Sequence, residues 1–563
     1  MNKRGICHHT NNPGVLHSIQ QFMLIGLGLL FCICTYAQFS INGIEPCYDQ
    51  RTHSFLISIP QSYWGKDYQA NIVLTRNSTW KHAIINHQII TQPVVFEHIQ
   101  GGKSYPIRVE SNGKVFNYTL SFTFLPIVHL IGDFNTVYSI GSVELQNPLQ
   151  ATQVMSAEIK WRGGSSNGPT KHKHNYKIKF IDEQGEKKDY SFFSLRNDNI
   201  WILDAGQVDL FRLRNLIAGK IWNSFATKPY YTVAESDVYT ASRGEVVEMF
   251  LNDEYHGIYN FCEPIDRKQL KLRKYNESTS QIHGGLWKAS GWGDATFYNN
   301  PKPYDNEQPT WGVFELKYPK LDDVSPSDYS TLYNAIKFVR TSSPSIFSEQ
   351  IEEYIDMPVF IDYCLFVYVL NAFDLAGKNL YWAVYDKQHH KKITLALWDM
   401  DSTVGQNSTD DPLHPDFVAW DSKLVEPTYI YSRLMRLNVN NFKQKLVNRY
   451  IQLRQSSFSF DYLADIYYHY HDLIKNSGAT SREELRWSGD SDIAFLQLNF
   501  EEELHYILDW LEHRLDYLDQ YFAKQYNVDV FASINNKFAI SGMKVDRSYK
   551  GIIIIKGKKY LVK

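Results

Sequence analysis

The sequence lacks a strong net charge and lacks long apolar segments beyond its N-terminus. Its 58 basic and 61 acidic residues leave a formal net charge of −3, which gives no electrostatic basis for binding nucleic acid or an anionic membrane. After the first 37 residues no apolar run is long enough to cross a bilayer. We therefore expect no nucleic-acid partner and no transmembrane segment.

Cysteine is also scarce, and this excludes two ways of stabilising a fold. Only 6 of the 563 residues are cysteine, and three of these lie in the first 37 residues. The remaining three, Cys47, Cys262 and Cys364, are too few for a disulfide framework, and no Cys-x-x-Cys pair indicates a zinc site. The fold must therefore depend on packing, for which a hydrophobic content of 44% is ample.

The N-terminal segment has the composition of an export signal. Lys3 and Arg4 provide positive charge, Phe22 to Cys34 is an apolar run of secretory length, and Ala37 ends a small-residue cleavage site. We predict a signal peptide at residues 1–37. The mature protein is then expected to be secreted, at the cell surface or periplasmic.

The next region, residues 38–126, has the pattern of an all-β domain. Short β-rich runs are separated by turn signals such as Gly101-Gly102 and Asn112-Gly113. Their number and spacing predict a β-sandwich of immunoglobulin-like size. No cluster of acidic residues, histidine or cysteine indicates chemistry, so this domain is interpreted as a spacer or binding module.

The most informative stretch is residues 358–405. An almost wholly apolar run from Val359 to Phe373 follows a proline and predicts a buried helix. A polar loop from Asp374 to Asn379, the strand LYWAVYD, a charged turn and the strand ITLALW come next, and the last strand ends on Asp399 and Asp401. Four oxygen-bearing side chains are thus expected at one end of a two-stranded unit.

Such a set of side chains suits metal-assisted phosphoryl transfer. Mg²⁺ takes oxygen ligands and is held through one or two carboxylates together with phosphates, while a further Asp accepts the proton of the attacking hydroxyl. Asp374 and Asn379 have the D-x-x-x-x-N spacing of a kinase catalytic loop, and Asp399 lies beyond a short hairpin. The alternative interpretation is that Asp374 caps a turn and that the later aspartates are solvated strand ends.

A second group of candidates lies earlier in the chain. The loop Arg162-Gly163-Gly164-Ser165-Ser166 joins two predicted strands, and Lys177 and Lys179 share one face of the second strand. Backbone N–H groups of small residues can approach a phosphate closely, and a lysine can pair with it. The loop does not match the Walker pattern, and an ordinary hairpin remains the alternative.

These segments occur in a family-specific order. The segments are WRGGSS with NYKIKF, FLNDEYHGIYNFCEPIDR, VFELKYP, NAFDLAGKNLYWAVYD and LALWDMDSTVG. In this order the chain resembles the CotH kinase family, secreted or surface proteins related to spore coat protein H, over roughly residues 127 to 525. The resemblance implies an α+β fold: an atypical protein-kinase-like two-lobed domain at 127–525 that binds ATP with Mg²⁺ or Mn²⁺ and phosphorylates secreted or surface proteins.

The resemblance also assigns roles by position. It implies a catalytic base at Asp374 and metal ligands at Asn379, Asp399 and Asp401, without deciding which aspartate is the main ligand. It implies nucleotide contacts at Arg162, Gly163, Gly164, Ser165, Lys177, Lys179, Glu263 and Lys288.

Within that set the lysines and the glutamate have linked roles. Lys177 or Lys179 would contact phosphates, and Glu263 would orient the lysine or hold metal. Lys378, next to Asn379, is a further candidate for a phosphate contact.

Two alternatives to a protein kinase remain at this stage. The chain is either an inactive kinase-like adhesin or binding scaffold, or an enzyme that transfers AMP in place of phosphate. The tail, residues 526–563, is expected to be a small β module, which is either related to sorting for export or a hairpin packed on the preceding helices. The acceptor and the oligomeric state are not indicated by any motif.

Overall fold

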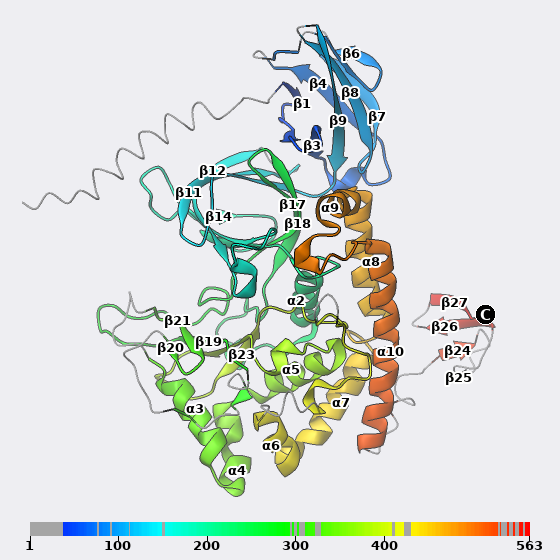
Figure 1. The fold of residues 1–563 in the computed structure, drawn as a ribbon. Coiled ribbons are helices and arrows are strands. Elements are labelled where there is room, and N and C mark those ends of the chain that lie inside the picture. Colours follow the sequence, from blue (N-terminus) through cyan, green and yellow to red (C-terminus); the bar gives the residue numbers. More distant parts are fainter. Residues whose placement is uncertain are drawn as a thin grey trace, which may run out of the picture. The chain divides into compact units, whose positions relative to one another are not determined.

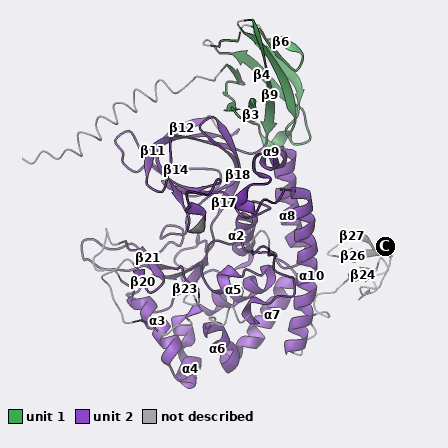
Figure 2. Ribbon diagram, in the orientation of Figure 1, with its two compact units in different colours: residues 1–123 green, residues 124–563 purple. Residues whose placement is uncertain are grey.

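The structure, a computed structural model, has a mixed α+β fold (Figure 1). It describes residues 38–75, 78–80, 82–90, 93–111, 113–148, 152–292, 296–297, 301–302, 310–320, 328–407, 411–421, 429–526 and 530, and four strands between 537 and 562. The predicted signal peptide lies outside the described residues. The chain divides into two compact units, residues 1–123 and 124–563 (Figure 2).

The described part of the first unit consists of two β-sheets. Their strand orders are β1-β4-β7 and β2-β3-β9-β8-β5-β6. The strands are β1 (Phe39–Ile41), β2 (Cys47–Asp49), β3 (Ser54–Ser58), β4 (Tyr68–Leu74), β5 (His82–Ile85), β6 (Gln88–Ile90), β7 (Val94–Ile99), β8 (Ser104–Ser111) and β9 (Lys114–Thr123). The rings of Phe39 on β1 and Phe55 on β3 lie 5.0 Å apart, so the two sheets pack against each other.

The second unit begins with a closed seven-stranded barrel of order β10-β11-β12-β13-β16-β18-β17. Its strands are β10 (Ile127–Ile131), β11 (Ser139–Gln146), β12 (Gln153–Arg162), β13 (Asn175–Phe180), β16 (Ile200–Asp204), β17 (Gly244–Leu251) and β18 (Glu254–Cys262). A small two-stranded sheet of β14 (Tyr190–Ser191) and β15 (Asn197–Asp198) accompanies it.

The alternation of β13 decides which side chains leave the barrel. Tyr176 and Ile178 are buried in the barrel core, together with Trp201 and Phe261. Because successive side chains of a strand point to opposite faces, Lys177 and Lys179 lie on the outer face. The lysines that the sequence places on one face are therefore directed away from the barrel core.

A five-stranded sheet of order β20-β21-β19-β22-β23 follows. Its strands are β19 (Gly285–Ala289), β20 (Thr310–Trp311), β21 (Phe314–Tyr318), β22 (Leu380–Val384) and β23 (Thr394–Leu397). An apolar cluster joins this sheet to the outside of the barrel, because Ile202 of β16 and Cys262 of β18 share it with Tyr381, Ala396 and Trp398. The charged side chains of the candidate site lie at the edge of this contact.

Nine α-helices are found in the described residues. They are α2 (Arg214–Phe225), α3 (Ser330–Thr341), α4 (Pro344–Tyr354), α5 (Met357–Leu370), α6 (Tyr429–Leu437), α7 (Phe442–Arg454), α8 (Phe460–Asn476), α9 (Ala479–Trp487) and α10 (Phe500–Tyr526). None of the described helices combines the length and the apolar character that a membrane span requires.

The predicted apolar helix is α5, which is confirmed and ends three residues earlier than expected. Pro358 lies in its first turn, and nearly every side chain of the helix is buried. Asn371 ends the helix in the left-handed conformation, with φ of 50°. The predicted hairpin after the polar loop is β22 paired antiparallel with β23.

The C-terminal region contains four short strands in the order β25-β24-β26-β27. They are β24 (Lys537–Ala539), β25 (Lys544–Val545), β26 (Gly551–Ile555) and β27 (Lys558–Val562). A β module was expected here, and its relation to sorting stays a prediction.

Candidate active site

The loop after α5 is held in place by backbone contacts at both ends. Residues Asp374–Ala376 form a single 3-10 turn, and the Tyr363 hydroxyl on α5 donates a hydrogen bond of 2.6 Å to the Leu375 carbonyl. The Asn379 N–H donates to the Ala289 carbonyl at the end of β19, at 3.0 Å. The loop is thereby fixed between the helix and the five-stranded sheet.

Asp374 and Lys378 form an ion pair within this loop. The Lys378 Nζ lies 2.9 Å from Asp374 Oδ2, and both side chains are partly buried. Burial raises the pKa of Asp374 and the charge of Asp399 adds to this, whereas Lys378 opposes it. Asp374 is therefore a stronger base than a solvated aspartate, with a cation beside it.

Asn379 is almost completely buried and has unused hydrogen-bonding capacity. It is 5% exposed and adopts φ of 62°, and its Nδ2 has no hydrogen-bond partner among the residues that the structure describes. A buried amide group without a partner is costly, so its presence at this loop favours a ligand that it contacts.

The loop that carries Asp399 and Asp401 is fixed by the first turn of α2. The buried Arg214 donates from Nε to the Thr403 carbonyl at 3.1 Å. Asn215 Oδ1 accepts a hydrogen bond from the Met400 N–H at 3.1 Å. Asp399 itself adopts φ of 63°, a left-handed conformation that aspartate tolerates better than most residues.

Asp204, Asp374 and Asp399 all lie within electrostatic reach of Asp401; we call these four aspartates the aspartate corner. Burial raises the pKa of Asp401 well above its usual range, and the charges of Asp399, Asp204 and Asp374 raise it further, in that order. The side chains lie on three separate segments: the end of β16, the loop after α5 and the loop after β23. Their mutual repulsion would be relieved by a bound cation.

Two cations, Arg162 and Lys288, lie within electrostatic reach of these aspartates, and Lys177 lies within electrostatic reach of Arg162. Burial and neighbouring basic groups, including Lys320, Arg162 and Lys179, lower the pKa of Lys177 to about 8. Burial also lowers the pKa of Lys288, while the charge of Asp399 opposes the shift. Within the part of the chain that the structure describes, no carboxylate oxygen lies within 4.0 Å of a charged nitrogen of Arg162, Lys177 or Lys288.

The glycine loop between β12 and β13 has little room at one position and open space at the next. Gly163 adopts φ of 123°, and a Cβ there would lie 2.1 Å from Ser166 Oγ, whereas a Cβ at Gly164 would meet nothing within 4 Å. Ser166 Oγ accepts a hydrogen bond from Asn175 Nδ2 at 3.1 Å, which ties the loop to β13. Ser165 contributes backbone to the single turn Ser165–Asn167.

Two residues of the predicted nucleotide set have partners of their own. Glu263 is fully buried, and its Oε1 accepts hydrogen bonds from the Arg243 guanidinium at 2.7 Å and from the Arg196 N–H at 2.8 Å. Lys179 lies 3.4 Å from Glu158 and 3.7 Å from the centre of the Tyr138 ring. The structure thus pairs Glu263 with arginine, and Lys288 is the lysine whose pKa is affected by the charge of Asp399.

The carboxylates of the four aspartates, all of which are among the described residues, do not lie close enough together to coordinate a metal ion without other ligands. Among the described residues, one set of three acidic or histidine side chains has ligand atoms within 4.8 Å of one another: His172, Asp490 and Asp492. Asp492 Oδ2 already accepts hydrogen bonds from two backbone N–H groups, at 2.8 and 3.2 Å, so this set serves as a turn cap. The wider spacing at the corner suits Mg²⁺, which keeps coordination positions for water and phosphate.

Sequence reasoning missed Asp204 and Asn215. Asp204 follows the apolar run IWIL at the end of a strand, as Asp399 follows LALW. A carboxylate at the end of an apolar strand was the signal that drew attention to Asp399, and the same signal would have found Asp204. Nothing in the local sequence marks Asn215.

Trp292 was also missed and lies against the loop from Asp374 to Asn379. Its ring contacts that of Phe373 at 5.1 Å, and a Cβ on Gly377 would lie 1.6 Å from it. Trp292 is 43% exposed and lines a cavity of about 320 Å³ with Phe297, Trp311 and Phe314.

Comparison with known proteins gives one family. Residues 159–518 match the family described as CotH kinase protein. No curated protein matches the chain. The matched range includes Arg162, Lys177 and Lys288 as well as the loops that carry Asp374, Asp399 and Asp401.

Proposed function

Because this chain belongs to the CotH kinase family, we propose that it is a secreted atypical protein kinase that uses ATP with Mg²⁺ or Mn²⁺. The main observation in support is that basic and acidic side chains face one another at one edge of the contact between the barrel and the five-stranded sheet. Arg162 interacts electrostatically with Asp204 and Lys288 with Asp399, and Lys177 lies within electrostatic reach of Arg162. The anions are Asp204, Asp374, Asp399 and Asp401. A metal–triphosphate is the ligand that needs both.

In this proposal the barrel and the helical part act as two lobes. The barrel contributes the Gly163–Gly164 loop, whose open backbone can lie over phosphates, together with Arg162 and Lys177. The five-stranded sheet contributes Lys288. These cations offset phosphate charge, and the apolar contact between barrel and sheet keeps water from the interior side of the site.

The bound nucleotide and metal would supply an electrophilic phosphoryl group whose developing charge is spread over metal and cations. Asp374 orients the acceptor hydroxyl and accepts its proton, a role favoured by its raised pKa. Asp399, Asp401 and the Asn379 side-chain oxygen are the oxygen ligands that fit the metal. The acceptors are proposed to be hydroxyl groups of extracellular or surface proteins.

A transfer assay tests the proposal. Wild-type protein is incubated with ATP labelled at the γ-phosphate, a divalent cation and either itself or a hydroxyl-bearing protein. We expect labelling by the wild type and a loss of at least about a hundredfold in Asp374→Asn, the scale of general-base contributions. Asp399→Asn, which removes a proposed metal ligand, should also lose labelling. Asp465→Asn, which changes an exposed aspartate on α8, is the matched control and should label normally.

Three outcomes would contradict the proposal. The first is wild-type labelling in Asp399→Asn. The second is an intact-mass increase that corresponds to AMP in place of phosphate. The third is the absence of any shift in melting temperature with ATP and Mg²⁺, which a nucleotide-binding protein must show by linkage and a pure scaffold would not.

A further inference from the structure

Asp204 lies where the barrel meets the loop that carries the proposed metal ligands. It is the last residue of β16 and is partly buried. Burial raises its pKa, and the charge of Asp399 raises it further, which places the two carboxylates within electrostatic reach. Asp209, in the loop after β16, also raises the pKa of Asp401, but its carboxylate is paired with Arg214 at 2.7 Å.

One side chain connects Asp204 to that loop. Asn215, in the first turn of α2, donates from Nδ2 to Asp204 Oδ2 at 2.7 Å. Its Oδ1 accepts from the N–H of Met400, the residue between the two loop aspartates, at 3.1 Å. A single amide therefore sets the position of the barrel carboxylate relative to the loop.

The remaining oxygen of Asp204 is weakly engaged. Asp204 Oδ1 accepts one hydrogen bond, from the Gly206 N–H at 3.3 Å, which is long for such a bond. A carboxylate oriented on one oxygen by an amide and only weakly hydrogen-bonded on the other is the arrangement of a metal ligand supported by an outer partner.

We propose that Asp204 is an additional oxygen ligand for the divalent cation, supplied by the barrel, and that Asn215 is the positioning residue that holds it in register with Asp399 and Asp401. The inference deepens the proposed function, because it concerns the same site. It assigns to the cation a second role, which is to join the barrel to the helical part of the unit.

Mn²⁺ binding to the nucleotide-free protein tests this independently of phosphate transfer. Free Mn²⁺ is measured by electron paramagnetic resonance during titration of the full-length mature protein. We expect Asp204→Asn to weaken Mn²⁺ binding about tenfold or more, and Asn215→Leu to weaken it by a smaller factor. In the double variant, Asn215→Leu should add little, because it acts through Asp204.

A matched control separates metal binding from folding. Glu245→Gln removes another partly buried barrel carboxylate, on β17, that does not interact with the four aspartates. It should bind Mn²⁺ as the wild type does. Melting temperatures in EDTA report whether each variant is folded.

The inference is overturned if folded Asp204→Asn binds Mn²⁺ with wild-type affinity, or if the wild type binds none. It is also overturned if Asn215→Leu weakens binding equally with and without Asp204. Failure of the proposed function gives a different result: Mn²⁺ binding that depends on Asp204, together with an absence of labelled phosphate transfer.

Discussion

At the residue scale, the contact between Asp374 and Lys378 determines how the proposed base responds to pH. The positive charge 2.9 Å away stabilises the carboxylate form and so holds the pKa of Asp374 below the value that burial alone would produce. The interaction is local to one loop and spans four residues. Its loss should therefore alter proton transfer more than folding.

We predict that Lys378→Met moves the acidic limb of the pH–rate profile to higher pH. Without the cation, the pKa of Asp374 rises, so the carboxylate is protonated at a higher pH and the rate begins to fall there. Lys378→Arg keeps the positive charge and should leave the acidic limb of the pH–rate profile where it lies in the wild type. The measurement is kcat for phosphate transfer between pH 5 and 9, and an unchanged acidic limb in Lys378→Met would contradict the prediction.

Glu245 provides a residue-scale prediction about stability. Burial raises its pKa above the ordinary value of 4.5, with Lys220 opposing the shift. The folded state then binds more protons than the unfolded state between the two pKa values, so stability falls as pH rises through this window. At neutral pH the charged carboxylate therefore lowers the free energy of unfolding.

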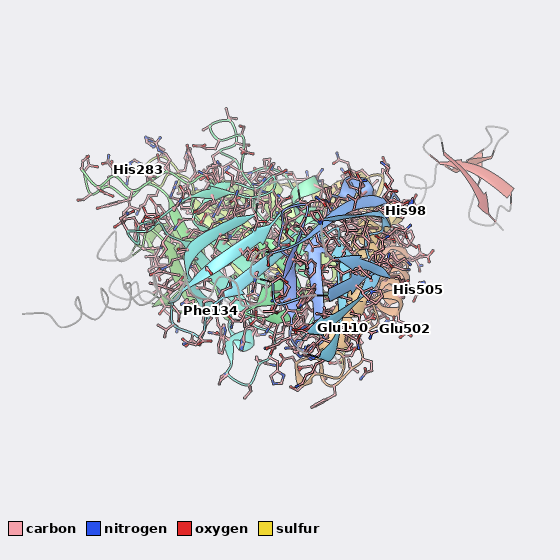
Figure 3. All side chains as sticks on the ribbon, turned by 90° about the horizontal axis from the view of Figure 1, so that it is seen from above. His98, Glu110, Phe134, His283, Glu502 and His505 are labelled. Atoms are coloured by element: carbon pink, nitrogen blue, oxygen red, sulfur yellow. The ribbon has the colours of Figure 1, made fainter. Side chains whose placement is uncertain are left out.

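We therefore predict that Glu245→Gln raises the melting temperature at pH 8 and leaves it unchanged at pH 4.5 or below. Glu502→Gln is the control, since Glu502 is exposed on α10 (Figure 3). Equal melting temperatures of wild type and Glu245→Gln at pH 8 would show that the carboxylate is well solvated.

At the element scale, the loop from Asp374 to Asn379 is in close contact with Trp292. The absence of a side chain at Gly377 lets the indole ring lie directly on the loop, next to Phe373. Any Cβ at this position must displace either the ring or the loop, and with the loop the Asp374–Lys378 pair.

We predict that Gly377→Ala lowers the free energy of unfolding by about 1–3 kcal/mol, the usual cost of overpacking, and lowers kcat. In a Trp292→Ala background the same substitution should cost much less, because the space is then free. Urea unfolding and transfer rates of the four proteins complete the double-mutant cycle. Additive effects would mean that the ring and the glycine do not share a contact.

Much of this element could be predicted from the sequence because its signals are local. The apolar run after Pro358, the polar loop and the alternation of LYWAVYD specify helix, loop and hairpin without reference to distant residues. The grouping of Asp374 with Asp399 follows from that order, since a hairpin returns its second strand to the loop. The paired Lys378 also lay within the predicted loop.

The partners contributed by distant segments could not be predicted. Asp204 joins the aspartates only because Asn215 bridges β16 to Met400, a residue 185 positions further on than Asn215. The sequence left Glu263 available for a lysine, but Arg243, the residue before β17, forms an ion pair with it in the fold. Such pairings depend on barrel closure, which periodicity does not reveal.

At the scale of the second unit, a buried ionic group ties the barrel to the helices. Glu483 on α9 is fully buried; its Oε1 lies 2.7 Å from Arg212 Nε and 3.0 Å from Lys173 Nζ. Its Oε2 accepts a hydrogen bond from the Ile258 N–H of β18 at 2.7 Å. Gly257 permits this approach, since a Cβ there would lie 1.9 Å from the carboxylate.

Removing the charge of Glu483 should therefore be far more damaging than removing an exposed carboxylate. Arg212 would be left as a buried cation without this counter-ion, and Lys173, whose pKa burial already lowers to about 7, would lose its proton. We therefore predict that Glu483→Gln lowers the free energy of unfolding by about 3–5 kcal/mol. Glu502→Gln should change it by less than about 0.5 kcal/mol, as is usual for surface positions. Both are measured by urea unfolding of the mature chain.

The set of amides that lose protection in Glu483→Gln shows whether Glu483 stabilises the contact between the barrel and the helices or only its own helix. Because Glu483 holds the backbone of β18 as well as two side chains, its loss should expose amides of β18 and α9 to hydrogen exchange before those of α5. Faster exchange confined to α9 would show that the carboxylate stabilises only its own helix. Joint loss of protection in β18 and α9 is the result that a shared ionic centre requires.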